Sequence, residues 1–117
     1  MVWLAQKDVK KLSQRAMDAI NAHDLLVSPM VTVELAYLRE LGKVIRSPRD
    51  ILRQLQVQIG VRTCGHPFPE IADVAADETW SRDPFDRMIV AHAKANGYAP
   101  LITSDEKIRR NYPRAVW

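Results

Sequence analysis

The chain has 117 residues, one cysteine and a formal net charge of +3, with 47% hydrophobic and 26% charged residues. These values are typical of a globular protein, so we expect residues 1–117 to form a single domain with one core. The lone Cys64 excludes an internal disulfide and favours a reducing, cytoplasmic setting. No apolar stretch approaches the length of a bilayer, so we expect no membrane association. The mild basic charge permits nucleic-acid binding without requiring it.

The first half of the chain carries repeated helix-start signals. Ser13 can cap a helix, and residues 25–28 are typical of a short buried strand. Ser28-Pro29 then predicts a helix that runs to about Leu41. Ser47-Pro48 begins another helix, which Gly60 should end.

The second half continues the alternation of strands and helices. The predicted elements are a strand at 61–64, a helix from Pro69, a helix from Asp83-Pro84 to about Asn96, a strand at 101–103, a short helix capped by Ser104 and a strand at 115–117. Residues 88–91 are apolar nearly all round, which predicts a buried helix. The pattern indicates an α/β fold with a mainly parallel sheet, although the strands are few for so many helices.

Glu34 is an acidic residue among apolar helix neighbours. Residues three and four positions away are Met30, Val31, Tyr37 and Leu38, so the carboxylate faces the packed side of its helix. An ionised carboxylate is costly to bury without a partner. A metal ligand would explain this position, and a structural ion pair or a place at the edge of the apolar face would explain it equally well.

Asp83 and Asp86 lie at the start of the helix that begins with Pro84. Their spacing resembles a capping box, and both charges would favour the positive end of the helix dipole. The functional alternative is that one of them is a metal ligand. Asp105 follows the predicted strand 101–103, where ligands bind in open parallel sheets, yet it would also serve as an ordinary first-turn acid.

Together these acids are more informative than any one of them. All lie near strand-to-helix transitions or helix starts, and clustered carboxylates suit Mg²⁺ or Mn²⁺. Such ions activate water and neutralise charge during phosphodiester cleavage. A glycine-rich phosphate loop is absent from the sequence, which disfavours nucleotide hydrolysis of the P-loop type.

Three segments resemble successive motifs of PIN-domain proteins, most closely the toxin component of VapBC toxin–antitoxin pairs. They are Val31-Thr-Val-Glu-Leu-Ala36, Arg82-Asp-Pro-Phe-Asp-Arg-Met-Ile-Val-Ala91 and Leu101-Ile-Thr-Ser-Asp105. The resemblance implies a parallel sheet flanked by helices, and a Mg²⁺- or Mn²⁺-dependent endoribonuclease that cuts RNA and is held inactive by a cognate antitoxin. It also implies a homodimer.

The resemblance assigns roles to individual residues. Glu34, Asp86 and Asp105 match the family's catalytic, metal-binding acids, Asp83 matches an additional metal-binding acid, and Thr103 matches a polar companion of Asp105.

One departure from the family is an expected loss of the usual first strand and its aspartate. Residues 1–4 are similar to the helix that normally follows that strand. We expect that the printed sequence starts at an internal or introduced methionine; a natural truncation, or a strand supplied by another chain, is also open. An alternative function follows, in which the chain is a catalytically impaired PIN-fold binding module that retains antitoxin or partner binding.

Overall fold

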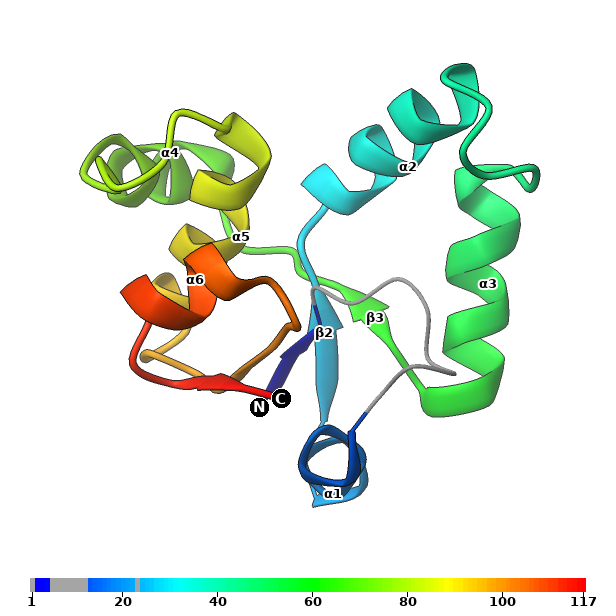
Figure 1. Cartoon of the computed structure of the whole chain (residues 1–117), viewed down its shortest axis with the longest axis horizontal. Helices are drawn as coiled ribbons and strands as arrows, with labels where there is room; N and C mark the ends of the chain where they lie inside the picture. Colours follow the sequence, from blue (N-terminus) through cyan, green and yellow to red (C-terminus); the bar gives the residue numbers. More distant parts are fainter. Residues whose placement is uncertain (1, 5–12, 23) are drawn as a thin grey trace.

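The computed structural model describes residues 2–4, 13–22 and 24–117. Its elements in chain order are β1 (Val2–Leu4), α1 (Gln14–Ala22), β2 (Leu25–Val27), α2 (Met30–Glu40), α3 (Pro48–Ile59), β3 (Arg62–Thr63), α4 (Phe68–Ala76), α5 (Pro84–Ala95), β4 (Leu101–Ile102), α6 (Glu106–Asn111) and β5 (Ala115–Val116). Strands and helices alternate along most of the chain, as the sequence predicts (Figure 1).

The strands form one sheet in the order β3-β2-β1-β4-β5, and every neighbouring pair is parallel. Parallel strands need crossover connections, which the helices supply, so both faces of the sheet become covered. The predicted α/β fold with a mainly parallel sheet flanked by helices is confirmed.

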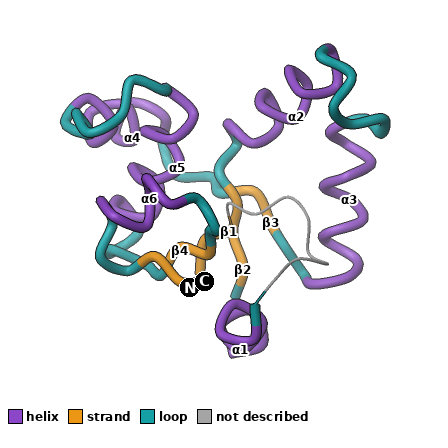
Figure 2. The backbone as a smooth tube through the Cα atoms, in the orientation of Figure 1, coloured by secondary structure: helices purple, strands orange, loops and turns teal. Residues whose placement is uncertain are grey.

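The two faces of the sheet contribute to different hydrophobic cores because side chains alternate along a strand. Leu25 and Val27 of β2 pack into a core with residues of α1, α2 and α3. Leu26, between them, packs into a second core with residues of α5 and α6. Figure 2 shows the strands at the centre, with α4, α5 and α6 gathered on one side of them and α1, α2 and α3 around the other.

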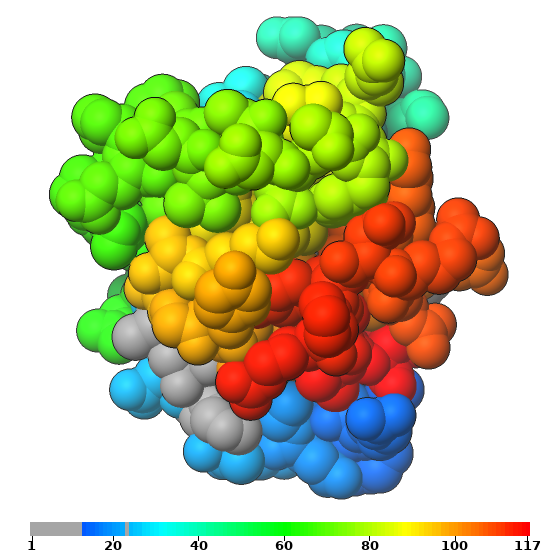
Figure 3. Space-filling model, turned by 90° about the vertical axis from the view of Figure 1, so that its left-hand side faces the viewer, coloured from blue at the N-terminus to red at the C-terminus, as the bar shows by residue number. Residues whose placement is uncertain are grey.

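Helix α4 forms an outer layer over α5. Its Ile71 and Ala75 pack against Met88 and Ala91 of α5, while other residues of α5 pack into the second core, so all residues from Met88 to Ala93 are buried. The prediction of a buried helix here is confirmed. Figure 3 shows this side of the molecule, with α4 in green above the C-terminal segment in red and α1 in blue below.

The expectation of a missing first strand is wrong for the described residues, because Val2–Leu4 form a strand rather than part of a helix. β1 lies at the centre of the sheet, where Trp3 pairs with Leu26 on one side and with Leu101 on the other. Without it, β2 and β4 would face each other across a gap with unpaired backbone groups, which are costly to bury. Met1 lies outside the described residues.

In the described part of the chain, no helix combines the length and the apolar character needed to cross a bilayer.

Candidate functional site

The four predicted acids lie on three helices around the carboxyl ends of the strands. Glu34 lies in the second turn of α2, Asp83 and Asp86 lie at the start of α5, and Asp105 begins α6. Figure 1 shows α2 above the carboxyl end of β2, and α5 and α6 beside it. Parallel strands present all their carboxyl ends at one edge of the sheet, which is where ligands bind in such folds.

Asp83 caps α5 with one carboxylate oxygen. Its Oδ1 accepts a hydrogen bond of 2.8 Å from the backbone N–H of Phe85. The Asp83 N–H donates to Ser81 Oγ at 3.1 Å, and the side chain of Arg87 donates to the Ser81 carbonyl at 2.6 Å. The predicted cap is therefore present, but the Asp83 N–H pairs with Ser81 rather than with Asp86, so the reciprocal half of a capping box is not made.

Asp105, rather than the predicted Ser104, is the N-terminal cap of α6. Its Oδ1 accepts from the Ile108 N–H at 2.9 Å, and its own N–H donates to Thr103 Oγ1 at 3.1 Å. Thr103 is buried, so its hydroxyl group fixes the backbone at the point where the chain leaves β4. Thr103 thus holds the backbone of Asp105 in place.

The surroundings of Asp86 raise its pKa. Burial, followed by the charges of Asp83, Asp105 and Glu34, raises its pKa from 3.8 to about 6, against a smaller opposing effect of Lys107. Neighbouring negative charges disfavour ionisation because they repel the charge that forms. The structure therefore brings three of the predicted acids close enough to act on the carboxyl group of the fourth, Asp86.

These carboxylates match the donor chemistry that a divalent cation needs. Carboxylate oxygens are the preferred ligands of Mg²⁺ and Mn²⁺, and a cation placed among them would relieve the repulsion at Asp86. Among the described residues, however, no three acidic, histidine or cysteine side chains already converge on one point as a ready-made metal group. The donor set fits such an ion in its chemistry, and ligand binding would have to draw the side chains together.

Three supporting residues were not predicted from the sequence: Ser81, Arg87 and Lys107. Ser81 is buried and joins the Asp83 N–H to the Arg87 guanidinium, so these two residues hold the turn that presents Asp83 and Asp86. The spacing Ser81-x-Asp83, typical of a side-chain-capped turn, was the available signal. Lys107, on α6, acts electrostatically on Asp86 by lowering its pKa.

We call the carboxyl-end edge of the sheet that carries Glu34, Asp83, Asp86 and Asp105 the acidic edge. The fold and this edge together define a nuclease-like α/β domain. The chain belongs to the PIN-domain family, because the sequence pattern of that family matches residues 1–112. The chain is also similar to Ribonuclease VapC22 of Mycobacterium tuberculosis, with 32% identity over 117 residues that cover 97% of this chain and 88% of that protein. The family predicted from the three short motifs is thereby confirmed.

Proposed function

We propose that this chain is a metal-dependent endoribonuclease of the PIN type that acts as the toxin of a toxin–antitoxin pair. The observation that carries the proposal is the gathering of Glu34, Asp83 and Asp105 around the half-buried Asp86, whose pKa is raised first by burial and then by these three charges. The name of the similar protein, Ribonuclease VapC22, supports RNA as the substrate.

Glu34, Asp83, Asp86 and Asp105 would hold Mg²⁺ or Mn²⁺ in this proposal. Such an ion supplies an activated water and neutralises the charge of the phosphodiester. Asp83 and Asp105 each use one oxygen to cap a helix, which fixes the direction of the carboxylate. Thr103 orients Asp105 through the backbone and is a positioning residue.

The biological setting is part of the same proposal. We place the protein in the cytoplasm as a single PIN-like domain over residues 1–117, bound by a cognate antitoxin and paired as a homodimer. The family match over residues 1–112 supports the domain assignment.

The decisive test is Glu34→Gln, which removes a charge from the acidic edge while keeping the shape of the side chain. RNA cleavage in Mg²⁺ or Mn²⁺ should fall roughly 100-fold or more, because losing a metal ligand costs at least as much as losing a neighbour that orients one. Cleavage of a labelled RNA, followed on a gel, measures this.

Glu40→Gln is the matched control, since Glu40 is exposed near the end of the same helix. It should cleave at the parent rate. If Glu34→Gln also cleaved at the parent rate, the assignment of Glu34 would be wrong.

The second candidate function is the catalytically impaired binding module. The observation that favours it is the sequence after β1, which reads Ala5-Gln6-Lys7 and has no acid before Asp8. Calorimetric titration with Mn²⁺ separates the two functions. Measurable binding that Asp86→Asn abolishes supports the nuclease, whereas an absence of binding to the parent chain supports the module.

A further inference from the structure

A second candidate site lies at the same edge of the sheet, between α2, α3 and β3. It is a hollow of about 420 Å³ lined by Val27, Thr32, Arg49, Leu52, Arg53, Gln56, Val61, Arg62 and Thr63. Val27 and Thr63 are the last residues of β2 and β3 and pair with each other across the sheet. The hollow therefore opens at the carboxyl ends of these strands, as the acidic edge does at β4.

All charged residues that line the hollow are arginines. Arg49 and Arg53 lie one turn apart on α3 and so project from the same side of that helix, and Arg62 lies on β3. All three are exposed, and within the described part of the chain none of them is ion-paired with a carboxylate. The remainder of the wall consists of three apolar residues and three uncharged polar ones: Val27, Leu52 and Val61, and Thr32, Gln56 and Thr63.

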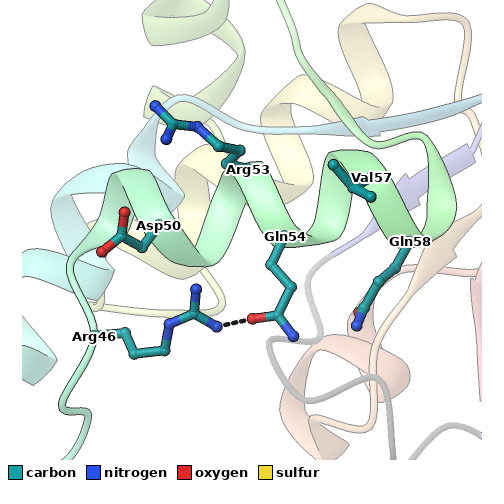
Figure 4. Close-up of a pocket in the computed structure, with 6 residues that line it drawn as sticks. All are labelled: Arg46, Asp50, Arg53, Gln54, Val57 and Gln58. Atoms are coloured by element: carbon teal, nitrogen blue, oxygen red, sulfur yellow. Dashed lines mark hydrogen bonds between the residues drawn. The ribbon is translucent and has the colours of Figure 1, made fainter.

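Arg46, which precedes α3, makes a different contact. Arg46 donates a hydrogen bond to the side-chain oxygen of Gln54, on a face of α3 that also carries Asp50. Figure 4 shows Arg53 extending from the opposite side of the helix to Arg46 and Gln54. Arg53 borders both this face and the hollow, whereas Arg46 does not line the hollow.

The chemistry of the hollow suits phosphate groups. Each arginine offers a planar fork of donors that matches the two free oxygens of a phosphodiester, and the hydroxyls of Thr32 and Thr63 add further donors. A carboxylate-rich edge repels a polyanion, so an RNA strand that reaches it needs cationic contacts elsewhere on the protein. Two strands lie between β3, which carries Arg62, and β4, which precedes Asp105, so these two ends of the edge are three strand spacings, roughly 15 Å, apart.

We propose that Arg49, Arg53 and Arg62 bind backbone phosphates of the RNA strand a short distance from the bond that is cut. This inference rests on the proposed function, because it places the same substrate on the same edge of the sheet. The hollow contributes affinity for the RNA and fixes which phosphodiester bond reaches the acidic edge, where hydrolysis takes place.

The test measures binding apart from cleavage. Single-stranded RNA with every ribose 2′-oxygen methylated cannot be cut, and EDTA removes divalent ions. Fluorescence anisotropy with this labelled RNA gives the Kd of the parent chain, of Arg49→Gln, Arg53→Gln and Arg62→Gln, and of the triple variant. Arg15→Gln, on α1 before the amino end of β2, is the matched control for loss of one exposed positive charge.

Each single change should weaken binding about fivefold, and the triple change about 100-fold, since each removes charge-assisted hydrogen bonds. The slope of log affinity against log salt should fall by about 2 in the triple variant, because each phosphate contact on a single strand contributes about 0.7. Arg15→Gln should stay within about twofold of the parent. Urea unfolding checks that the triple variant is folded, and the single variants stand as the test if it is not.

Unchanged RNA binding by the single and triple variants overturns the inference. A triple variant that loses only a poly-glutamate peptide overturns it as well, since the hollow would then be a protein-docking site. A different result would show that the proposed function is wrong. In that case RNA binding would still depend on the arginines, but the parent chain would cleave no RNA with Mn²⁺. If the parent cleaves and the triple variant keeps its KM, the inference fails while the nuclease assignment stands.

Discussion

Asp86 is held in an environment that opposes its charge. Its side chain is half-buried, and three other carboxylates act on it, so its pKa rises to about 6. An arrangement of this kind costs stability in the absence of a cation, and such costs are typical of functional sites. The contrast with Asp83 and Asp105, which stabilise helix starts, identifies Asp86 as the acid with the least structural benefit.

The pH dependence of stability should reveal this cost. Between the ordinary pKa of 3.8 and the folded-state pKa of about 6, the folded chain holds more protons than the unfolded chain. The free energy of unfolding should therefore fall as the pH rises through this window, by about 1 kcal/mol once screening by water is included. Asp86→Asn removes this fall and should be more stable than the parent near neutral pH. Urea unfolding in steps from about pH 4 to pH 7 measures both curves.

Asp73→Asn is the control for that series, because Asp73 is exposed on α4. Its stability should follow the parent curve across the window. A parent curve that rose with pH to the same extent as that of Asp86→Asn would contradict the assignment of Asp86.

Tyr112 anchors the segment between α6 and β5 in the second core. Its side chain is 1% exposed and its hydroxyl group donates to the Ala99 carbonyl at 2.6 Å. Burial is the main reason that its pKa rises to about 12. Tyr112→Phe leaves that buried carbonyl without its partner and should cost about 1 to 2 kcal/mol of unfolding free energy.

Thermal and urea unfolding measure the loss at Tyr112. Tyr98→Phe is the comparison, because Tyr98 is 56% exposed and should change stability by less than about 0.5 kcal/mol. Equal effects of the two changes would show that the Tyr112 hydrogen bond contributes nothing.

At the level of elements, the short helix α6 gives a way to separate the structural and catalytic roles of Asp105. Asn caps helices as well as Asp does, whereas Ala does not. Asp105→Asn should therefore keep the stability of the parent and lose RNA cleavage, and Asp105→Ala should lose cleavage and about 1 kcal/mol of stability.

Ser47→Ala is the reference for a purely structural cap. Ser47 caps α3 by accepting from the Asp50 N–H at 3.2 Å, so its loss should also cost about 1 kcal/mol, with cleavage unchanged. Full activity of Asp105→Asn in the same gel assay would restrict Asp105 to its capping role.

Helix boundaries were the most predictable feature of the fold. Ser47-Pro48 and Asp83-Pro84 carry their own start signals, and the left-handed Gly60 ends α3 as expected. Ser104 illustrates the limit of such reasoning. Ser104 and Asp105 are both good caps, and the choice between them depends on the Thr103 hydroxyl, which bonds the Asp105 N–H.

The sequence allows candidate acids to be selected, but it does not show that they lie close together. Local spacing accounts for Asp83 and Asp86, which share a helix start. That Glu34 and Asp105 act on Asp86 depends on the order of strands in the sheet, which no local pattern contains. The place of Val2–Leu4 in the middle of the sheet has the same origin, since three residues carry little periodicity of their own.

Considered as a whole, the molecule gathers its carboxylates from distant parts of the chain, so a cation bound among them should stabilise the entire fold. Mn²⁺ at about 100 times its Kd should add about 2.7 kcal/mol to the unfolding free energy near neutral pH. The gain should shrink as the pH falls below about 6, because protonated Asp86 is a poor ligand. Thermal unfolding with and without Mn²⁺ measures it.

Sodium chloride at matched ionic strength is the control for screening, and Glu34→Gln is the control for the site. Neither should reproduce the gain in Tm. A gain of equal size in Glu34→Gln would place the bound ion elsewhere on the protein.

The position of β1 divides the sheet between the two halves of the chain. β2 and β3 lie on one side of it, and β4 and β5 lie on the other. Glu34 belongs to the half that is synthesised first, and Asp83, Asp86 and Asp105 to the half that follows. Until residue 83 has been added, the growing polypeptide holds only one of the four acids, and the fourth is added only at residue 105. Translation of this protein can therefore proceed beside messenger and ribosomal RNA, with no assembled carboxylate site before β4 has emerged from the exit tunnel.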